Sequence, residues 1–317
     1  MKKRGVVVLG MHRSGTSAVT RVVNLLGPRL GRDDDLYSAP DNPGGHWESV
    51  SLCAANDAVL GFFGGTDICP PRLRSGWERS ARARSILPAL RSVFDHVYGD
   101  DDPYGGEPWL WKDPRLCLTL PIWRQVLGEF CIVLVIRNPT AVADSLHRRE
   151  GFPSLYCRAV WDWYNRSAVQ AVSGLPVAVV DFDAVTEDPA AETARLAERL
   201  DTLGVPIIGD PVIASRAVDA SVPRRSQHVA ADVLTAQTFE ILRSLPVQCG
   251  HFPVLGECRQ QRWTWPLFQA GRVWSALEAP RNRVAAGSLI PRSARLRGCG
   301  PDGAPLGPES KTDGVRR

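Results

Sequence analysis

The chain is poor in lysine and in long apolar runs, and each shortage limits what the protein can be. Only four of its 38 basic residues are lysines, so arginine carries nearly all of the positive charge. No stretch approaches the roughly 20 consecutive apolar residues that a membrane-spanning helix needs, so we expect no stable membrane insertion. The first apolar run ends at Gly10, which is too short for the core of a secretion signal. We therefore expect a cytoplasmic protein.

Cysteine is present but follows no recognisable pattern. The eight cysteines are scattered without C-x-x-C spacing, which predicts reduced thiols rather than a disulfide framework. Cys249, His251 and Cys258 come nearest to a metal-ligand set, but their spacing fits no zinc pattern and a fourth ligand is missing. The sequence therefore predicts no metal site.

The formal net charge of +4 hides two unequal regions. Residues 259–317 have a net charge of +7, and the remainder has −3. A mildly acidic body lacks the clustered basic face that binds phosphates, so we expect no nucleic-acid partner. The Pro, Gly, Arg and Ser content of 259–317 predicts a partly disordered tail after one domain at 1–258. The aromatic residues early in this tail are expected to dock on the domain as core: Trp263, Trp265, Phe268 and Trp274.

Short apolar runs alternate with helical patterns along the domain. This order predicts an α/β fold, a P-loop-like three-layer αβα arrangement with a central parallel sheet covered on both faces. Ligands bind at the carboxyl ends of the strands in such folds, so the loops after the strands are where function is expected. The predicted strands are 5–9, 109–111, 131–136 and 177–180, and the predicted helices are 17–26, 52–62, 78–97, 140–149, 155–172, 190–203 and 231–245.

The first of these loops is GMHRSGTS, residues 10–17. A glycine loop between a strand and a helix directs backbone N–H groups and a helix N-terminus at one point, which suits a phosphate. Its spacing equals the pattern G-x4-G-K-[ST], except that Thr16 replaces the lysine that holds the β- and γ-phosphates of a nucleoside triphosphate. Arg13 is expected to supply the cation instead. Taken alone, the loop also fits a tight turn that caps a helix.

The loop after the third predicted strand has the sequence RNPTAVADS. Proline suits the first turn of a helix, so Asn138 and Pro139 are expected to begin one that carries Ser145 two turns on. The Ser145 hydroxyl and the Arg137 guanidinium, whose planar fork suits a phosphate, would then converge on one anion. Alone, the two residues also fit an exposed strand end and an ordinary helix position.

The segment WLWKDPRL carries Lys112, the only lysine between Lys3 and Lys311. It stands where a predicted strand ends and the chain turns. A compact ammonium in a chain that otherwise uses arginine indicates a role that a bulky guanidinium does not fill. The alternative is a surface lysine that pairs with Asp113.

Together these segments resemble the sulfotransferase superfamily, in particular bacterial members and the tyrosylprotein and carbohydrate branches, over roughly residues 3–245. The resemblance implies transfer of a sulfonate group from the co-substrate 3′-phosphoadenosine 5′-phosphosulfate to a hydroxyl or amine of an acceptor such as a carbohydrate, lipid or secondary metabolite, without a metal. Residues 13–16 match the family's 5′-phosphosulfate loop, Arg137 and Ser145 its 3′-phosphate pair, and residues 112–115 its element beside the sulfonate. The C-terminal signature of cytosolic aryl sulfotransferases is absent, which speaks against small phenols and steroids.

A fourth segment, DNPGGHWES, is similar to a family loop that brings a glutamate to the acceptor. Glu48 is the favoured general base, because a carboxylate in a closed site can have a pKa suited to that work, and His46 is its rival. Arg224 and Arg225 resemble the family's basic segment that closes over the nucleotide. The implied catalytic residues are Glu48, His46, Lys112 and Arg13, and the implied co-substrate-binding residues are His12, Arg13, Ser14, Gly15, Thr16, Ser17, Arg137, Ser145, Arg224 and Arg225.

Two other functions remain open at this stage. A small-molecule kinase with a degenerate nucleotide loop is favoured by the fold and opposed by Thr16. A non-catalytic nucleotide-binding or interaction protein would use the aromatic and basic tail as its working surface. Nothing in the sequence indicates an oligomeric state.

Overall fold

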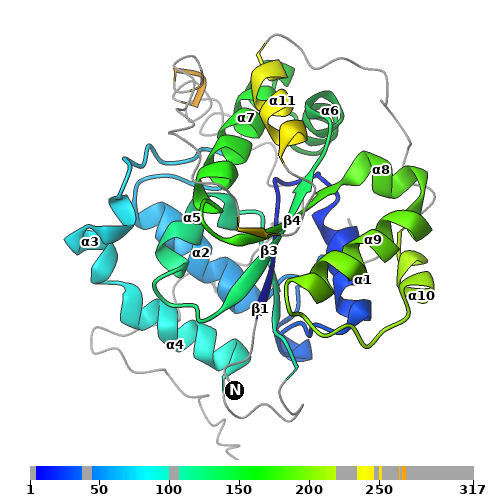
Figure 1. Ribbon diagram of the computed structural model, residues 1–317. Coiled ribbons are helices and arrows are strands. Elements are labelled where there is room, and N and C mark those ends of the chain that lie inside the picture. Colours follow the sequence, from blue (N-terminus) through cyan, green and yellow to red (C-terminus); the bar gives the residue numbers. More distant parts are fainter. Residues whose placement is uncertain are drawn as a thin grey trace, which may run out of the picture. The chain divides into compact units, whose positions relative to one another are not determined.

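The central sheet lies between two groups of described helices (Figure 1). The computed structural model describes residues 5–37, 45–99, 107–218, 234–245, 250–251, 264 and 266–268. Five strands within these ranges form one sheet in the order β2-β1-β3-β4-β5, with the first four parallel and β5 antiparallel to β4. The predicted α/β fold with a central parallel sheet is confirmed. The strands are β1 (Gly5–Leu9), β2 (Leu110–Lys112), β3 (Phe130–Ile136), β4 (Pro176–Asp181) and β5 (Gly250–His251).

The strands send their side chains alternately into two buried apolar clusters, one on each face of the sheet. In β1, Val6 and Val8 belong to one cluster, whereas Val7 and Leu9 belong to the other, because successive residues of a strand point to opposite faces. Every residue of β1 and β3 is buried. Burial on both faces explains why these strands are continuous apolar runs in the sequence.

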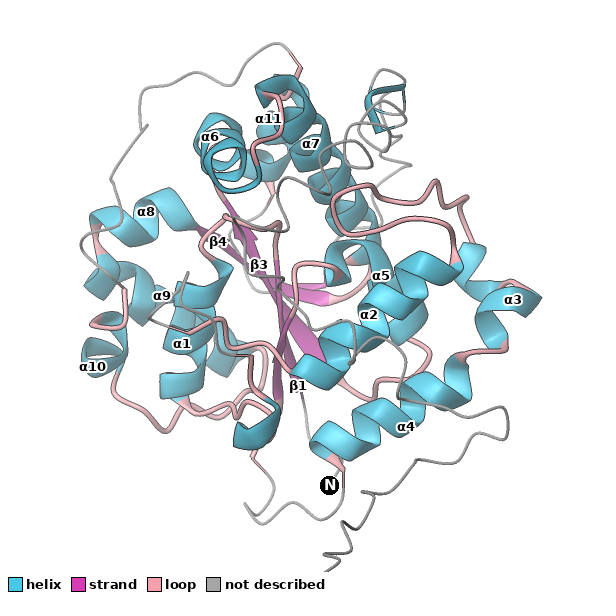
Figure 2. Ribbon diagram, turned by 180° about the vertical axis from the view of Figure 1, so that it is seen from behind, coloured by secondary structure: helices cyan, strands magenta, loops and turns pink. Residues whose placement is uncertain are grey.

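One face of the sheet is covered mainly by aliphatic side chains from four helices. Val19, Val22, Val23 and Leu26 form the buried stripe of the first helix, with the spacing that places residues on one helix face. These helices lie together on one side of the sheet in both ribbon views (Figures 1 and 2). They are α1 (Thr16–Leu26), α8 (Phe182–Glu187), α9 (Pro189–Thr202) and α10 (Pro211–Ser215).

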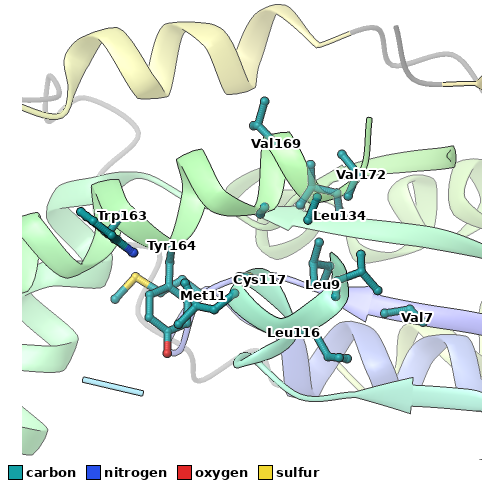
Figure 3. Packing of buried hydrophobic residues seen from close by; sticks show 14 of the residues in the cluster. Val7, Leu9, Met11, Leu116, Cys117, Leu134, Trp163, Tyr164, Val169 and Val172 are labelled. Atoms are coloured by element: carbon teal, nitrogen blue, oxygen red, sulfur yellow. The ribbon is translucent and has the colours of Figure 1, made fainter. Parts of the chain in front are cut away.

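The other face is richer in aromatic residues. Trp111 of β2 meets Trp123 with ring centroids 4.7 Å apart and nearly perpendicular planes, a favourable edge-to-face geometry. Tyr164, Trp163, Met11 and Cys117 are buried members of the same cluster (Figure 3). The helices that build this face are α2 (Val50–Phe62), α4 (Leu87–Tyr98), α5 (Leu116–Trp123), α6 (Pro139–Glu150), α7 (Ser154–Ala171) and α11 (Ala236–Ser244).

The single helix predicted over 78–97 is wrong, because the structure has three short elements there. They are η2 (Trp77–Arg79), α3 (Ala81–Arg84) and α4. The Ser80 hydroxyl accepts from the Ala83 amide and starts a new helix, and Pro88 stands in the first turn of α4, where it cannot donate to a preceding turn. The prediction also missed α5, which is buried on nearly all sides and contains Pro121, so it shows no amphipathic period. The predicted strands and other helices match observed elements to within a few residues, although residues 231–233 lie outside the described ranges.

Phe268, which belongs to the predicted tail, is fully buried in the aromatic cluster. Its ring meets Trp163 at 5.1 Å and Tyr156 at 5.8 Å, both edge to face. For this residue the expected docking as core is confirmed. The chain divides into compact units at Met1–Arg272 and Val273–Arg317. Trp263, Trp265, Trp274 and the second unit lie outside the described residues, and the domain boundary at 258 stays a prediction.

Candidate functional site

Three loops of functional interest leave the same edge of the sheet. In the parallel register Val8 of β1 lies beside Lys112 of β2, and Leu9 lies beside Leu134 of β3. The carboxyl ends of these strands are therefore neighbours, and β1 stands between the other two. In open α/β sheets this edge is where ligands bind.

The loop 10–17 needs glycine at position 15. Gly15 has φ +88°, and a Cβ atom there would lie 2.2 Å from the Phe182 ring. Arg13 also has a positive φ, 68°. Gly15 precedes α1, whose N-terminus has no side-chain cap, so its first amides are free to hold an anion. The Ser14 and Thr16 side chains are buried. The Ser14 N–H donates to the Met11 carbonyl at 3.2 Å, so the backbone N–H of Thr16 is the part of this pair able to meet a ligand.

Arg13, Arg137 and Ser145 come together beside this loop, and we call them the cationic group. Arg13 Nε donates to Ser145 Oγ at 2.9 Å, and Arg137 Nη1 donates to the Arg13 carbonyl at 3.0 Å. Asn138 caps α6 as predicted, since its side chain accepts from the amides of Thr140 and Ala141. The structure thus links the predicted pair Arg137 and Ser145 through Arg13.

The Arg137 side chain is mostly buried, and its charge is only partly compensated. Its Nε atom has no hydrogen-bond partner among the described residues and lies 3.7 Å from Asp183 Oδ1. The guanidinium carbon lies 5.1 Å from the centre of the Phe182 ring. Burial lowers the pKa of Arg137, which Asp183 partly opposes and Arg148 reinforces. A buried N–H donor without a partner is costly, so an anion would be stabilised here.

Lys112, Glu48 and Ser17 form a second set of contacts, which we call the lysine group. Lys112 is only 2% exposed, and its Nζ forms an ion pair with Glu48 Oε1 and donates to Ser17 Oγ at 3.2 Å. The alternative of a surface lysine paired with Asp113 is therefore wrong. Residues from three separate predicted motifs meet at this point.

Of the two predicted bases, only the Glu48 side chain reaches Lys112. Its second carboxylate oxygen accepts from Cys53 Sγ at 3.6 Å. The His46 ring instead packs edge to face on Tyr37, with centroids 5.1 Å apart. It is the His46 carbonyl that meets Ser17, whose hydroxyl donates to it at 3.5 Å.

The turn after Lys112 is held by a buried polar network. Asp113 is fully buried and accepts from Asn56 Nδ2 at 2.8 Å and from Arg115 Nη1 at 3.0 Å. Arg115 Nε also donates to Asp57 Oδ1 at 2.7 Å. A satisfied network of this kind fixes the turn, and with it the strand end that carries Lys112. Asn56 Oδ1 in turn accepts from the Thr119 hydroxyl and from Trp123 Nε1.

On the other side of the loop, His12 faces acidic residues that the sequence analysis did not identify. His12 Nε2 is buried, has no hydrogen-bond partner among the described residues, and lies 3.9 Å from Asp67 Oδ2. Its ring meets that of Tyr164 at 5.6 Å. Burial lowers the pKa of His12 well below its ordinary value, and Arg115 and Arg149 lower it further. No local sequence signal marks Asp57 or Asp67, because their proximity to His12 and Arg115 arises from tertiary packing.

Two of the predicted binding residues, Arg224 and Arg225, lie outside the described residues. In the described part of the chain, no group of three or more His, Cys, Asp or Glu side chains is placed to hold a metal ion. Nor is any described helix both long and apolar enough to cross a bilayer.

A separate open cavity of about 940 Å³ lies between residues 71–79, α5 and α7. Its described lining includes neither the loop 10–17 nor Lys112, so it is distinct from the site at the strand ends. The basic side chains that line it are Arg72, Arg74, Arg79 and Arg124.

Comparisons with known proteins give structural similarity only. No family model matches the chain, and no curated protein matches it. A sulfotransferase domain from the Synechococcus PCC 7002 olefin synthase is 16% identical, with a TM-score of 0.38 over 85% of this chain and 96% of that one. A sulfotransferase domain from the curacin biosynthetic pathway is 14% identical, with a TM-score of 0.39 over 85% and 98%. Sulfotransferase STF9 from Mycobacterium avium is 12% identical, with a TM-score of 0.41 over 86% and 76%.

Proposed function

We propose that this chain transfers a sulfonate group from 3′-phosphoadenosine 5′-phosphosulfate to a hydroxyl or amine of an acceptor. The observation that supports this most is the cationic group, in which Arg13 links Arg137 to Ser145 next to an uncapped helix N-terminus. This donor has two separate anionic parts, the 5′-phosphosulfate and the 3′-phosphate, so it needs two anion-binding positions. A nucleoside triphosphate would instead need the lysine that Thr16 replaces.

In the proposed complex, the backbone amides of residues 12–17 hold the 5′-phosphosulfate, and Arg137 with Ser145 holds the 3′-phosphate. The buried Nε of Arg137 has no hydrogen-bond partner among the described residues, although Asp183 Oδ1 lies 3.7 Å away. A 3′-phosphate would accept a charge-assisted hydrogen bond from it. Because Arg13 Nε donates to Ser145 Oγ, a hydrogen bond connects the proposed 3′-phosphate position to the loop 10–17.

Transfer requires negative charge to be stabilised as the acceptor oxygen or nitrogen bonds to sulfur and the sulfur–oxygen bond to the 5′-phosphate breaks. Lys112 is proposed to supply that stabilisation, together with Arg13, because a fixed cation in a site with little water is effective at this task. Ser17 and Glu48 orient the Lys112 ammonium. The other product is adenosine 3′,5′-bisphosphate.

Glu48 is the proposed general base, with His46 as the predicted rival. The ion pair with Lys112 suggests how the two would work together. When Glu48 takes the acceptor proton, its attraction for Lys112 weakens, and the ammonium becomes available to the oxygen on which charge is developing. Proton removal and charge stabilisation would then be coupled in one step.

The test of this function is a calorimetric titration of the full chain with adenosine 3′,5′-bisphosphate, ATP with magnesium, and adenosine 5′-monophosphate. We expect the bisphosphate to bind most tightly and its advantage over the monophosphate to disappear in Arg137→Ala. Arg91→Ala, an exposed change on α4, is the control and should bind as the wild type does. A preference for ATP would support the kinase, and no nucleotide binding would support the non-catalytic alternative.

A further inference from the structure

His12 and Asp67 leave a gap that no side chain among the described residues bridges. His12 Nε2 lies 3.9 Å from Asp67 Oδ2, which is too long for a hydrogen bond. The nitrogen has no other hydrogen-bond partner among the described residues. Asp67 is positioned by its own backbone, because its Oδ1 accepts from the Ile68 amide at 2.9 Å, and the Asp67 carbonyl accepts from the Tyr164 hydroxyl at 2.6 Å. The spacing is therefore built into the fold.

One hydroxyl or amine would satisfy both groups. An oxygen about 2.8 Å from each of two atoms that are 3.9 Å apart makes an angle near 90° between them, which a hydroxyl can accommodate. Such a group would donate to the Asp67 carboxylate and accept from His12, or donate to a neutral His12 ring. A carboxylate, phosphate or sulfate would place its charge against Asp67 and is disfavoured.

The surroundings reinforce this choice of ligand. Three carboxylates lie here, and Arg115 pairs with two of them, Asp57 and Asp113. Among the described residues Asp67 has no ion pair with an arginine or lysine. We call these four residues and His12 the acidic cluster. Asp57 and Asp67 are 39% and 30% exposed at their side chains, whereas the His12 side chain is only 14% exposed, so a ligand can approach from the side of the carboxylates. An anionic group between His12 and Asp67 would lie against the Asp67 carboxylate.

The acidic cluster is joined to the lysine group by two stretches of chain. Residues 112–115 run from Lys112 to Arg115, and the loop 10–17 runs from His12 to Ser17. One acceptor lying along the loop would meet both places, with its reacting group at Glu48 and Lys112. An acceptor with a single hydroxyl would fill only one of them.

We propose that His12 and Asp67 form a second acceptor-binding position, which holds a hydroxyl or amine next to the reacting group, so that the acceptor is a neutral or amino sugar. This inference rests on the proposed sulfonate transfer. His12 and Asp67 are binding residues in it, and Glu48 keeps the role of base. Glu48 and Lys112 thus meet the reacting hydroxyl, whereas His12 and Asp67 hold the neighbouring group.

The experiment measures transfer of labelled sulfonate from 3′-phosphoadenosine 5′-phosphosulfate to methyl glucoside, glucosamine and glucuronate by the full chain. We expect kcat/KM for the first two probes to exceed that for glucuronate at least about tenfold, since a like charge at a fixed position is strongly rejected. Asp67→Asn should lower kcat/KM for glucosamine about tenfold and narrow its advantage over glucuronate. His12→Phe keeps an aromatic ring against Tyr164 but loses the nitrogen, and it should raise KM for both preferred probes.

The controls separate this inference from the function on which it rests. Asp201→Asn, an exposed change on α9, should leave every ratio as in the wild type. Asp67→Asn and Asp201→Asn should bind adenosine 3′,5′-bisphosphate with wild-type affinity, which also shows that they are folded. If the bisphosphate binds but neither methyl glucoside nor glucosamine is sulfonated, or if Asp67→Asn leaves the ratio to glucuronate unchanged, the second position is wrong. If the bisphosphate does not bind the wild type, the proposed function itself fails.

Discussion

The two flanks of the loop 10–17 differ in charge although they begin at adjacent residues. Arg13 points into the cationic group, with Arg137 and Ser145. His12 faces the acidic cluster, 3.9 Å from Asp67. The positive φ of Arg13, 68°, turns the chain between them, so one residue of backbone separates two opposite electrostatic environments.

The loop 10–17 therefore has a second effect beside its proposed role in holding a phosphate. It separates a positively charged site from a negatively charged one. The proposed donor, with its two anionic parts, would be attracted to the cationic flank and repelled from the acidic one. The lysine group stands at the far end of the loop, at Ser17. Opposite charges on the two flanks would thus keep donor and acceptor in their own places before any chemistry occurs.

The largest expected effect comes from replacing Lys112. Lys112→Met should lower kcat about a thousandfold, because it deletes a fixed cation where charge develops, while adenosine 3′,5′-bisphosphate affinity changes little. Because Glu48 would lose its ion-pair partner, the double variant Lys112→Met/Glu48→Gln is measured beside it. Steady-state kinetics and calorimetry check the result. A loss of kcat below about tenfold would remove Lys112 from the reaction.

The second change tests the base. Glu48→Gln keeps the size of the side chain and should lower kcat about a hundredfold, within the range usual for the loss of a general base. Donor binding should stay intact, which calorimetry with adenosine 3′,5′-bisphosphate measures. Full activity in this variant would make Glu48 a partner of Lys112 only, and His46→Ala is then the next variant to assay.

The third change weakens the cationic flank without touching the lysine group. Arg137→Ala should lower adenosine 3′,5′-bisphosphate affinity by about 10- to 100-fold, the usual range for a charge-assisted hydrogen bond. Adenosine 5′-monophosphate, which has no 3′-phosphate, should lose far less. Equal losses for the two nucleotides would mean that Arg137 shapes the loop rather than contacting the 3′-phosphate.

The smallest expected effect concerns the acidic flank and the pH dependence of stability. Burial raises the pKa of Asp57 to about 6, an effect that Arg115 opposes and that Asp67 and Asp113 reinforce. The folded-state pKa is raised, so the stabilisation is present below the ordinary pKa of 3.8 and is lost as pH rises through about 6. Because the side chain is 39% exposed, we expect a loss of only about 1 kcal/mol after solvent screening.

Urea unfolding of the wild type and Asp57→Asn over this pH range measures the effect. The free energy of unfolding of the wild type should fall relative to that of the variant as pH rises. Asp201→Asn should follow the wild type throughout. Parallel curves for the wild type and Asp57→Asn would show that Asp57 has an ordinary pKa.

Much of the cationic flank was predictable because its signals are local. The loop 10–17 is recognisable from its glycines. Asn138 and Pro139 mark the start of α6, and Arg137 follows a continuous apolar strand. Each motif could be recognised before its neighbours were known. Their common location then followed from parallel strands sharing a carboxyl edge.

The acidic flank was not predictable, because its members are joined only by tertiary packing. Asp57 lies on α2, Asp67 in the loop that follows, and Arg115 after β2. None stands in a pattern that separates it from a solvated surface charge. The pairing of Lys112 with Glu48 was missed for the same reason, since nothing in either segment specifies the other as its partner.

Phe182 gives the loop and the proposed phosphate arginine a common support. Its ring closes against Gly15 on one side and lies 5.1 Å from the Arg137 guanidinium on another. A smaller side chain at position 182 would remove the support of the loop 10–17 and of Arg137 at the same time.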